Sequence, residues 1–319
     1  SDAFEEYANN AHRSRRHWLI YGIVLGLGAA CVLSARARPP HAATTLSVNR
    51  PTTPRLKPLK HHPVVALTFD DLPAAGGLPP GETRTGIVTR LADELKANRL
   101  RGTYGFVTAS DLQNDPDSQQ ALRVWIAAGM NIGNHTWSHP SLDSIATAAY
   151  EHDIALDEPA LRQYAGRRNW HWLRYPYLDE GDTPARRNGV RDWLRAHGYR
   201  VAEATLTFQD DDWSDPYNRC LARHDDAGIA WLKQSYLESA AAFIPLGRKE
   251  EQIAFGHEIP NVLLLHATAF TTLMLPSLLH QLRQQGFRVG SLSKAARNHA
   301  YALDAGIGVP DDGPFRNQF

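Results

Sequence analysis

Cysteine is scarce in this chain, because only Cys31 and Cys220 occur among 319 residues. Since Cys31 lies in an apolar, membrane-like run, the pair can build neither a disulfide framework nor a cysteine-rich zinc site. The charges are balanced as well, with 34 Lys and Arg against 34 Asp and Glu, so there is no excess positive charge to hold nucleic acid phosphates. We therefore expect no nucleic acid partner, and we expect any bound metal to be held by histidines and carboxylates.

Apolar residues and histidines are the two classes that the chain has in quantity. Hydrophobic residues make up 43% of the sequence and charged residues 21%, which is enough for one sizeable core and excludes disorder of the whole chain. The 15 histidines fall partly in tight clusters, which is a first indication of metal or acid–base chemistry.

The longest apolar run, Trp18–Ala35, has no charged residue and is flanked by arginines. Its length is at the lower limit for crossing a bilayer, and basic residues before such a run are typical of a signal peptide or of an uncleaved anchor. Because segment 1–17 is long for the start of a signal peptide, we predict an anchor. Cleavage at Ala35-Arg36-Ala37 and a buried core helix are the alternatives.

The run divides the chain into segments with different predicted roles. The stretch 36–62 is rich in Pro, Thr and Ala without periodicity and is predicted to be a linker. A main domain over 63–299 and a tail over 300–319 follow. The anchor would place the main domain in the periplasm or outside the cell, attached to the membrane, or would release it as a secreted domain if it is cleaved.

Seven short β-branched or aromatic runs follow Pro63, with helical patterns between most of them. Strands that alternate with helices over one long domain predict an α/β fold with a parallel sheet, open or closed into a barrel. In such folds the ligand site lies at the carboxyl ends of the strands, which is where the polar clusters fall. The runs are VVALTF (64–69), TYGFV (103–107), NIGNH (131–135), WLRYP (172–176), RVAEATL (200–206), VLLLH (262–266) and FRVGSL (287–292).

Two of these polar clusters have the residue types of a metal site. Asp70 and Asp71 close the first run and point to opposite sides, so one can bind a metal while the other accepts a proton, although an ordinary acidic turn would explain them too. His135 and His139 follow the third run at a spacing that puts both imidazoles on one side. With one of the carboxylates they would form a His₂Asp site that leaves positions open for water.

These motifs and their order over most of 63–292 resemble the polysaccharide deacetylase family, the NodB-homology domain of the carbohydrate esterases. The resemblance implies a deformed (β/α) barrel with its catalytic domain over 63–299, a divalent metal with zinc as the first choice, and hydrolysis of acetyl groups on sugars. It also implies that Asp70 is the general base and that Asp71, His135 and His139 are the metal ligands.

The resemblance extends to the later motifs. In Arg174-Tyr175-Pro176-Tyr177, Arg174 would hold the base carboxylate by a bidentate ion pair, and the backbone N–H of Tyr177 would bind the developing oxyanion. His266 would be the general acid that protonates the leaving nitrogen. Trp213 and Leu264 would line the pocket for the acetyl methyl group.

Three positions depart from the family's pattern. Gln209 stands where the family often has Asp, four residues before the Trp, so it is left open whether Asp210, Asp211 or Asp212 pairs with Arg174 or whether the three form a solvated loop. Ala267 follows His266 where many members have Asp, so the pKa of His266 would be tuned from elsewhere. Leu72 stands where many members have Gly.

From these residues we predict a metal-dependent hydrolase that removes acetyl groups from N-acetylated sugars of a cell-envelope or extracellular polysaccharide, peptidoglycan- or chitin-like. It would act on linear amides, carbon–nitrogen bonds other than peptide bonds, with a metal-activated water, an Asp base and a His acid. The alternatives are an O-acetyl esterase or a small-amide hydrolase that uses the same site, and a catalytically inactive glycan-binding relative.

Overall fold

Strand β1 (Val64–Leu72) is buried along nearly its whole length and has neighbours along both edges. The computed structural model of the protein describes residues 63–74 and 76–302. In it β6 pairs with β1 from Val65 to Asp70, and the other edge of β1 is shared by β7 at its amino end and β2 at its carboxyl end. All described pairings are parallel, in the order β5-β4-β3-β2-β1-β6. The other strands are β2 (Tyr104–Val107), β3 (Asn131–Asn134), β4 (Trp172–Leu173), β5 (Arg200–Val201), β6 (Asn261–His266) and β7 (Arg288–Gly290).

The sheet closes on itself just after β5. Leu206 forms a parallel bridge with Leu263, and the backbone N–H groups of Thr205 and Leu206 both donate to the Val262 carbonyl, at 2.9 and 3.0 Å. The segment that leaves β5 therefore returns to β6, and the sheet forms a deformed barrel. The expected fold class is confirmed, and each of the seven predicted runs contains a strand. The strands β4 and β5 are much shorter than predicted.

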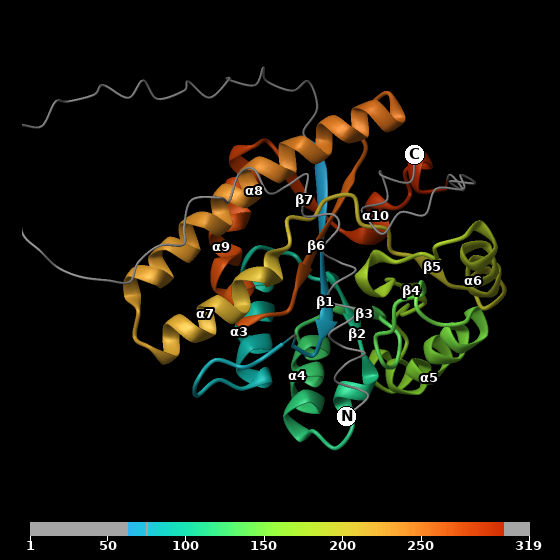
Figure 1. Ribbon diagram of the computed structural model, residues 1–319, viewed down its shortest axis with the longest axis horizontal. Coiled ribbons are helices and arrows are strands. Elements are labelled where there is room, and N and C mark those ends of the chain that lie inside the picture. Colours follow the sequence, from blue (N-terminus) through green and yellow to red (C-terminus); the bar gives the residue numbers. More distant parts are fainter. Residues whose placement is uncertain (1–62, 75, 303–319) are drawn as a thin grey trace, which may run out of the picture. The chain divides into compact units, whose positions relative to one another are not determined.

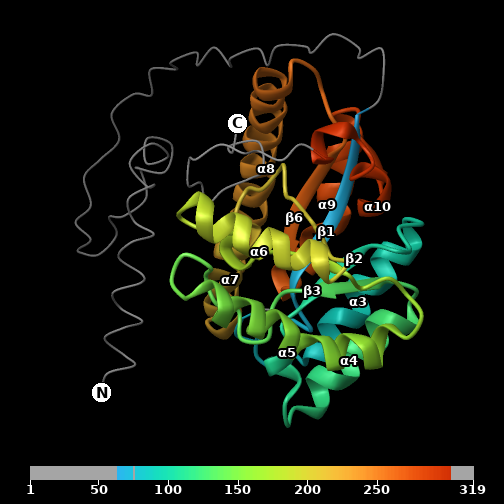
Figure 2. The same ribbon diagram turned by 90° about the vertical axis from the view of Figure 1, so that its right-hand side faces the viewer.

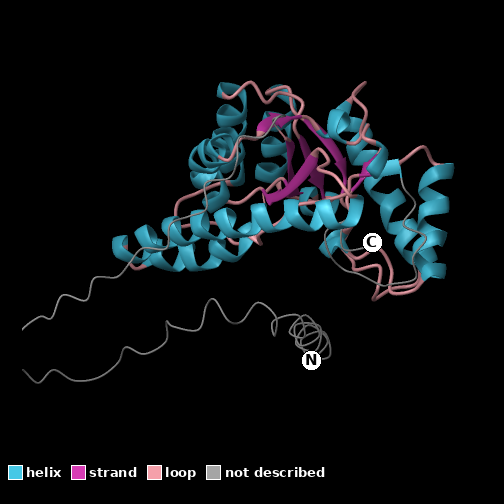
Figure 3. Cartoon of the chain, turned by 90° about the horizontal axis from the view of Figure 1, so that it is seen from above, coloured by secondary structure: helices cyan, strands magenta, loops and turns pink. Residues whose placement is uncertain are grey.

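Helices cover the outside of the barrel (Figures 1 and 3). The predicted pattern of Ile87, Leu91 and Leu95 is the buried face of α3, which begins after Thr83, whose side chain accepts a hydrogen bond from the N–H of Gly86. The long helix α8 runs along one flank of the domain (Figure 2) and contains Pro245. The helices are α3 (Arg84–Ala97), α4 (Pro116–Ala127), α5 (Thr147–Ala165), α6 (Pro184–Ala196), α7 (Ser214–Ala222), α8 (Asp226–Phe255), α9 (Ala269–Gln284) and α10 (Leu292–Ala295).

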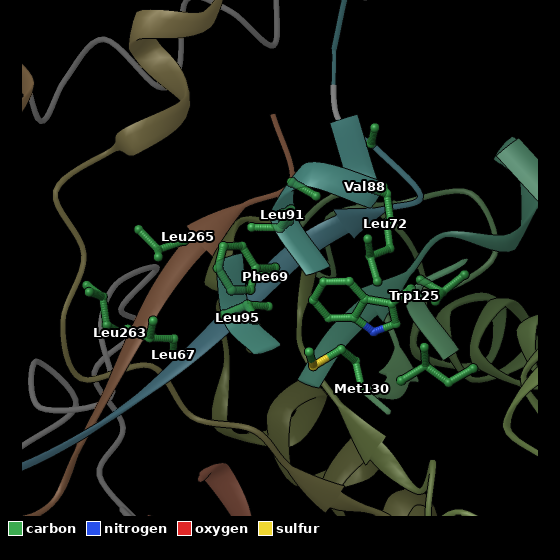
Figure 4. Close-up of a cluster of buried hydrophobic side chains, with 14 of the residues drawn as sticks. Leu67, Phe69, Leu72, Val88, Leu91, Leu95, Trp125, Met130, Leu263 and Leu265 are labelled. Atoms are coloured by element: carbon green, nitrogen blue, oxygen red, sulfur yellow. The ribbon is translucent and has the colours of Figure 1, made fainter. Parts of the chain in front are cut away.

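The alternation of side chains along the strands separates two cores. Outward-facing residues of β1 and β6, among them Leu67, Phe69 and Leu263, pack with α3 and with α4, which contributes Trp125 (Figure 4). Inward-facing residues fill the barrel, where the smaller core consists of Ala66, Tyr104, Phe106, Trp172, Ala202 and Val262, with Leu292, Ala295 and Ala296 from α10 and its C-terminal end. The same alternation turns every second residue of β1 toward the barrel interior, which is what positions the site.

Some of the predicted segments lie outside the described residues. They are segment 1–17, the anchor 18–35, the linker 36–62, and the tail from 303 onward. In the part of the chain that the structure describes, no helix is long and apolar enough to span a membrane. The packed domain continues slightly past residue 299, because His299–Ala302 form a 3-10 turn and Ala300 is buried.

Candidate metal-dependent active site

The pairing of β1 with β6 brings the first and the last predicted site residues together. Asp70 and His266 are register partners at the carboxyl ends of these strands, and Thr68 and Leu264 are partners two residues earlier. Because side chains alternate along a strand, these four positions share the interior face of the barrel. The expected location at the carboxyl ends of the strands is confirmed for these residues.

Asp71, His135 and His139 form a compact group of possible metal ligands. Nε2 of His135 and Nε2 of His139 each lie 3.3 Å from the same carboxylate oxygen, Oδ1 of Asp71. One ligand atom from each residue lies within 4.8 Å of the others. The group of residues predicted from the HxxxH spacing and the carboxylate pair is therefore the group that the fold brings together.

The orientation and charge of the two imidazoles suit metal binding. Nδ1 of His135 lies 2.8 Å from the backbone carbonyl of Arg174, so it donates there and leaves Nε2 free to act as a ligand. Burial and the neighbouring His135 lower the pKa of His139 to about 4, which keeps its ring neutral at neutral pH. Burial alone would raise the pKa of Asp71, but the hydrogen bond and charge of His135 hold it well below its usual range.

Helix α5 holds the loop that carries the two histidines. The carboxylate of Asp153 accepts hydrogen bonds from the backbone N–H and the hydroxyl of Ser138, at 2.9 and 2.7 Å. Asn134 accepts one from the N–H of Thr136 and donates one to the carbonyl of Ile154. Sequence reasoning missed Asp153 and Asn134. The role of Asn134 could have been predicted, because asparagine side chains commonly accept a hydrogen bond from the backbone N–H two residues later in the chain.

The backbone of the site is locally strained. Asp71, Thr136, His139 and Tyr177 all have positive φ, between 57° and 65°, although none is glycine. Such conformations cost free energy and persist where the surroundings impose them, and they gather at functional sites. Here they turn two of the candidate metal ligands, Asp71 and His139, toward one point.

Asp70 lies beside this group and is bound by a buried arginine. Nη1 of Arg174 lies 3.1 Å from both carboxylate oxygens of Asp70, and Nη2 donates to the hydroxyl of Thr68 at 3.1 Å. Nε of the same guanidinium donates to the carbonyl of Ala202 at 2.6 Å, and Arg174 is only 1% exposed. Asp70 is thus held by the cation and lies 3.9 Å from Nε2 of His135, while Asp71 lies closer to both histidines. The assignment of Asp70 as base and Asp71 as ligand stays a prediction.

The acidic loop pairs with His266 and not with Arg174, so for Asp210 neither of the two alternatives left open, a pairing with Arg174 or a solvated loop, is what the structure shows. In the 3-10 turn Asp210–Trp213, Asp210 accepts hydrogen bonds from the backbone N–H and from Nδ1 of His266, both at 2.9 Å, and one from the hydroxyl of Thr271 at 2.6 Å. Gln209 has φ 59°, and this left-handed residue directs the turn toward β6. The guanidinium of Arg174 is already occupied by Asp70, Thr68 and Ala202.

This pairing also supplies the tuning of His266 that its neighbour Ala267 cannot. Burial would lower the pKa of His266, but the charges of Asp210 and Asp211 raise it well above its usual value. Burial raises the pKa of Asp211 to about 6, against the lowering effect of His266. His266, Asp210 and Asp211 also lie close enough to share a cation. A protonated imidazole is not a metal ligand, so we interpret them as an ion-paired acid.

Tyr177, Leu264 and Trp213 are the remaining predicted site residues. The exposed ring of Tyr177 lies against His139, with 4.6 Å between ring centres. Leu264 is 5% exposed on β6. The indole of Trp213 donates to the hydroxyl of Ser235 and packs with Phe208 and Tyr236. The proposed role of Tyr177 toward an oxyanion and those of Leu264 and Trp213 toward an acetyl group stay predictions.

The chain is similar in sequence to known polysaccharide deacetylases. The sequence profile described as polysaccharide deacetylase matches residues 58–202. The peptidoglycan-N-acetylmuramic acid deacetylase PdaC of Bacillus subtilis is 27% identical over 178 residues, which cover 56% of this chain and 31% of that protein. The chitin deacetylase of Colletotrichum lindemuthianum is 28% identical over 158 residues, 48% of this chain and 55% of that one. The matched part thus spans less than two thirds of either relative.

Solved structures show the same fold. The chitin deacetylase from Colletotrichum lindemuthianum superposes with a TM-score of 0.50 and 22% identity, over 73% of this chain and 88% of the other. A mutant of a CE4 family pseudoenzyme, described as having restored enzymatic activity, also has a TM-score of 0.50, with 16% identity over 74% of this chain and 68% of the other.

Proposed function

This chain belongs to the polysaccharide deacetylase family, and from that premise we propose that it is a metal-dependent hydrolase that removes acetyl groups from N-acetylated sugars of a peptidoglycan- or chitin-like polysaccharide. The observation that carries the proposal is the junction at the carboxyl ends of β1 and β6. There a His₂Asp group, an arginine-bound carboxylate and an aspartate-bound imidazole lie side by side.

The donor set supports a divalent metal, with zinc the first choice. Two neutral imidazoles and one carboxylate form the three-ligand set of catalytic zinc sites, in which further positions stay open for water and substrate. Asp71, His135 and His139 would hold the ion. When bound, it would polarise the acetyl carbonyl and lower the pKa of a coordinated water.

The protein's own residues would manage the protons and the charge. Asp70, whose two carboxylate oxygens accept hydrogen bonds from Arg174, would accept the proton of the attacking water. The backbone N–H of Tyr177 would donate a hydrogen bond to the developing oxyanion. His266, protonated through its pairing with Asp210, would donate its proton to the leaving nitrogen. The products would be acetate and a free amino sugar.

The state of His266 favours an amide over an ester as the substrate. An amide nitrogen is a poor leaving group unless it is protonated, whereas an alkoxide leaves with less assistance. A buried histidine whose pKa two aspartates raise is a proton donor at neutral pH. The curated relatives also bear the names of peptidoglycan and chitin deacetylases. We therefore place N-acetylated glycans of the cell envelope ahead of O-acetylated ones.

The test is acetate release by the full chain from N-acetylglucosamine oligomers and from peptidoglycan. We expect release that a chelator abolishes and that zinc restores. The same assay on O-acetylated xylan would separate amide from ester hydrolysis. Zinc binding without release from any N-acetylated substrate would contradict the deacetylase proposal.

Two variants separate the roles of the adjacent carboxylates. Asp70→Asn should abolish turnover and retain zinc, whereas His135→Ala should lose both. Asp93→Asn, in α3, is the matched control and should behave as the parent protein, because Asp93 is exposed and forms only a surface ion pair with Lys96. Equal loss of zinc in Asp70→Asn and Asp71→Asn would mean that both carboxylates are ligands, and it would overturn the assignment of Asp70 as the base.

A further inference from the structure

Positive charge gathers at the end of the barrel opposite the candidate site. Parallel strands all begin at one end, and six arginines lie in the loops or at the strand starts of that end. All six are exposed. We call them the amino-end basic face: Arg99 and Arg101 before β2, Arg167 and Arg168 before β4, Arg200 at the start of β5 and Arg288 at the start of β7.

Ion pairs do not account for these arginines, although two of them bind carbonyls at helix ends. Arg168 donates to the carbonyl of Ile126 near the end of α4 at 3.3 Å, and Arg200 donates to the carbonyl of Ala296 at 2.8 Å and lies over the ring of Trp172. Among the described residues, no carboxylate forms an ion pair with any of the six. Carboxylates near this end are paired within their own part of the chain, as Asp93 is with Lys96 and Asp192 with Arg195. Helix C-termini attract cations, and Arg99 and Arg167 each stand two residues beyond the last residue of a helix, α3 and α5. The helix ends at this end of the barrel therefore contribute to the placement of the arginines, whose charges stay exposed.

The opposite end has the opposite sign. The carboxyl end of β1 carries Asp71, and segments that follow the strands carry Asp111, Asp179, Asp182, Asp211 and Asp212. The formal net charge of zero over the whole chain therefore conceals a separation of charge along the barrel axis. Such a separation orients a protein in the field of a charged surface.

Two further features lie at the basic end. The last turns of α8 expose Leu246 and Ile253, which are 41% and 76% accessible, and α8 ends five residues before β6 begins. The chain also enters the domain here, because Arg288 donates its backbone N–H to the carbonyl of Pro63 at 2.8 Å. In both ribbon views the start of β1 and the end of α8 lie at the same end of the domain (Figures 1 and 2).

We propose that the amino-end basic face binds the anionic headgroups of a phospholipid bilayer, so that the carboxyl-end site points away from that bilayer. Basic residues beside exposed apolar side chains are the combination with which proteins bind anionic membrane surfaces. A bilayer is the partner that also fits the sequence ahead of Pro63, where the charge-free run Trp18–Ala35 is predicted to cross a membrane. The 27 residues 36–62 link that run to this face.

The experiment uses the full chain in lipid nanodiscs, which separates insertion of segment 18–35 from contact of the domain. Hydrogen–deuterium exchange is compared between discs of phosphatidylcholine alone and discs that also contain phosphatidylglycerol. We expect exchange in segments 98–103, 166–171 and 286–290 to slow at least about threefold in the anionic discs, and exchange in segment 176–183 to stay unchanged. In 0.5 M NaCl the slowing should disappear, because the Debye length falls to roughly 4 Å.

Charge variants test the face directly. The triple variant R99Q/R101Q/R167Q should lose the slowing at low salt. The matched control R219Q/R223Q/K233Q removes the same charge from exposed residues of α7, its C-terminal end and α8, and it should retain the slowing. Equal exchange in both kinds of disc, slowing at 176–183 instead, or slowing that persists in R99Q/R101Q/R167Q would each overturn the proposal. If that variant fails to fold, the salt comparison on the parent protein decides.

Discussion

Asp210 binds His266 at two points, the backbone N–H and Nδ1, with both hydrogen bonds 2.9 Å long. The carboxylate thus fixes the ring's orientation as well as its charge. Nε2, the other ring nitrogen, is left to face the site. The buried hydroxyl of Thr271 donates to the same carboxylate and completes its hydrogen bonding.

Asp210→Asn should lower kcat/KM for deacetylation by about 10- to 100-fold at neutral pH, within what general acid catalysis contributes. Asp210 raises the pKa of His266, so its removal lowers that pKa, and the protonated acid is lost at a lower pH. The alkaline limb of the pH profile of kcat/KM should move to lower pH. Asp212→Asn, an exposed neighbour, is the control. An alkaline limb that stays in place would contradict the assignment of His266 as the acid.

Zinc should raise the thermal stability of the protein. A ligand that binds only the folded state at 100 times its Kd contributes about 2.7 kcal/mol, which raises Tm by roughly 5–10 °C for a domain of this size. The shift should vanish in His139→Ala and persist in Asp70→Asn, as measured by differential scanning calorimetry before and after a chelator. A full shift in His139→Ala would exclude that residue as a ligand.

Arg174→Met should destabilise the fold by about 3–5 kcal/mol, because it leaves the buried carboxylate of Asp70 without a counter-charge. The second change, Asp70→Asn, removes that charge and should restore part of the loss. Urea unfolding of the two single variants and the double variant measures the coupling. Additive losses in the double variant would show that the two side chains do not stabilise each other.

Gly133→Ala should cost about 3 kcal/mol or more and should reduce zinc binding, because β3 leads directly into the histidine loop. A Cβ at this position would lie 2.6 Å from the ring of Phe106 and 2.8 Å from the backbone carbonyl of Trp172, which cannot rotate away. Gly189→Ala in α6 meets only a methyl group of Thr147 at 3.2 Å, and the better helix propensity of alanine should raise stability by up to about 1 kcal/mol. Unfolding curves for both variants, compared with the parent, decide the sign.

The sequence was sufficient where local patterns determine structure. Continuous apolar residues identified β1 and β6, and the spacing of His135 and His139 identified the metal group, because strand ends and short loops keep neighbouring residues together. The closure of the barrel by Thr205 and Leu206 could not be predicted from the sequence, since their hydrogen bonds to Val262 join residues more than fifty positions apart. The lengths of the two-residue strands β4 and β5 were also overestimated. The ends of these strands depend on where the neighbouring strands stop, which is again a contact between distant residues.

The role of the acidic loop was the part of the site that the sequence left open, whereas the predicted pairing of Arg174 with Asp70 is present. Three consecutive aspartates, Asp210 to Asp212, offer the same charge, and sequence alone does not say which of them a 3-10 turn directs inward. The left-handed conformation of Gln209 directs Asp210 inward. Glutamine is not a residue type that marks positive φ, so the sequence contains no indication of this turn. Asp153 was missed because its target, Ser138, lies 15 residues earlier in the chain.

The position of β1 between early and late strands has a consequence for synthesis. The hydroxyl of Thr68 donates to the carbonyl of Leu263, 195 residues further on, and the whole edge from Val65 to Asp70 pairs with β6. At translation rates of about 5–20 residues per second, this apolar edge stays without its partner for roughly 10–40 s after it leaves the ribosome. During synthesis, this apolar strand edge is therefore open to pairing with other chains until β6 has been made.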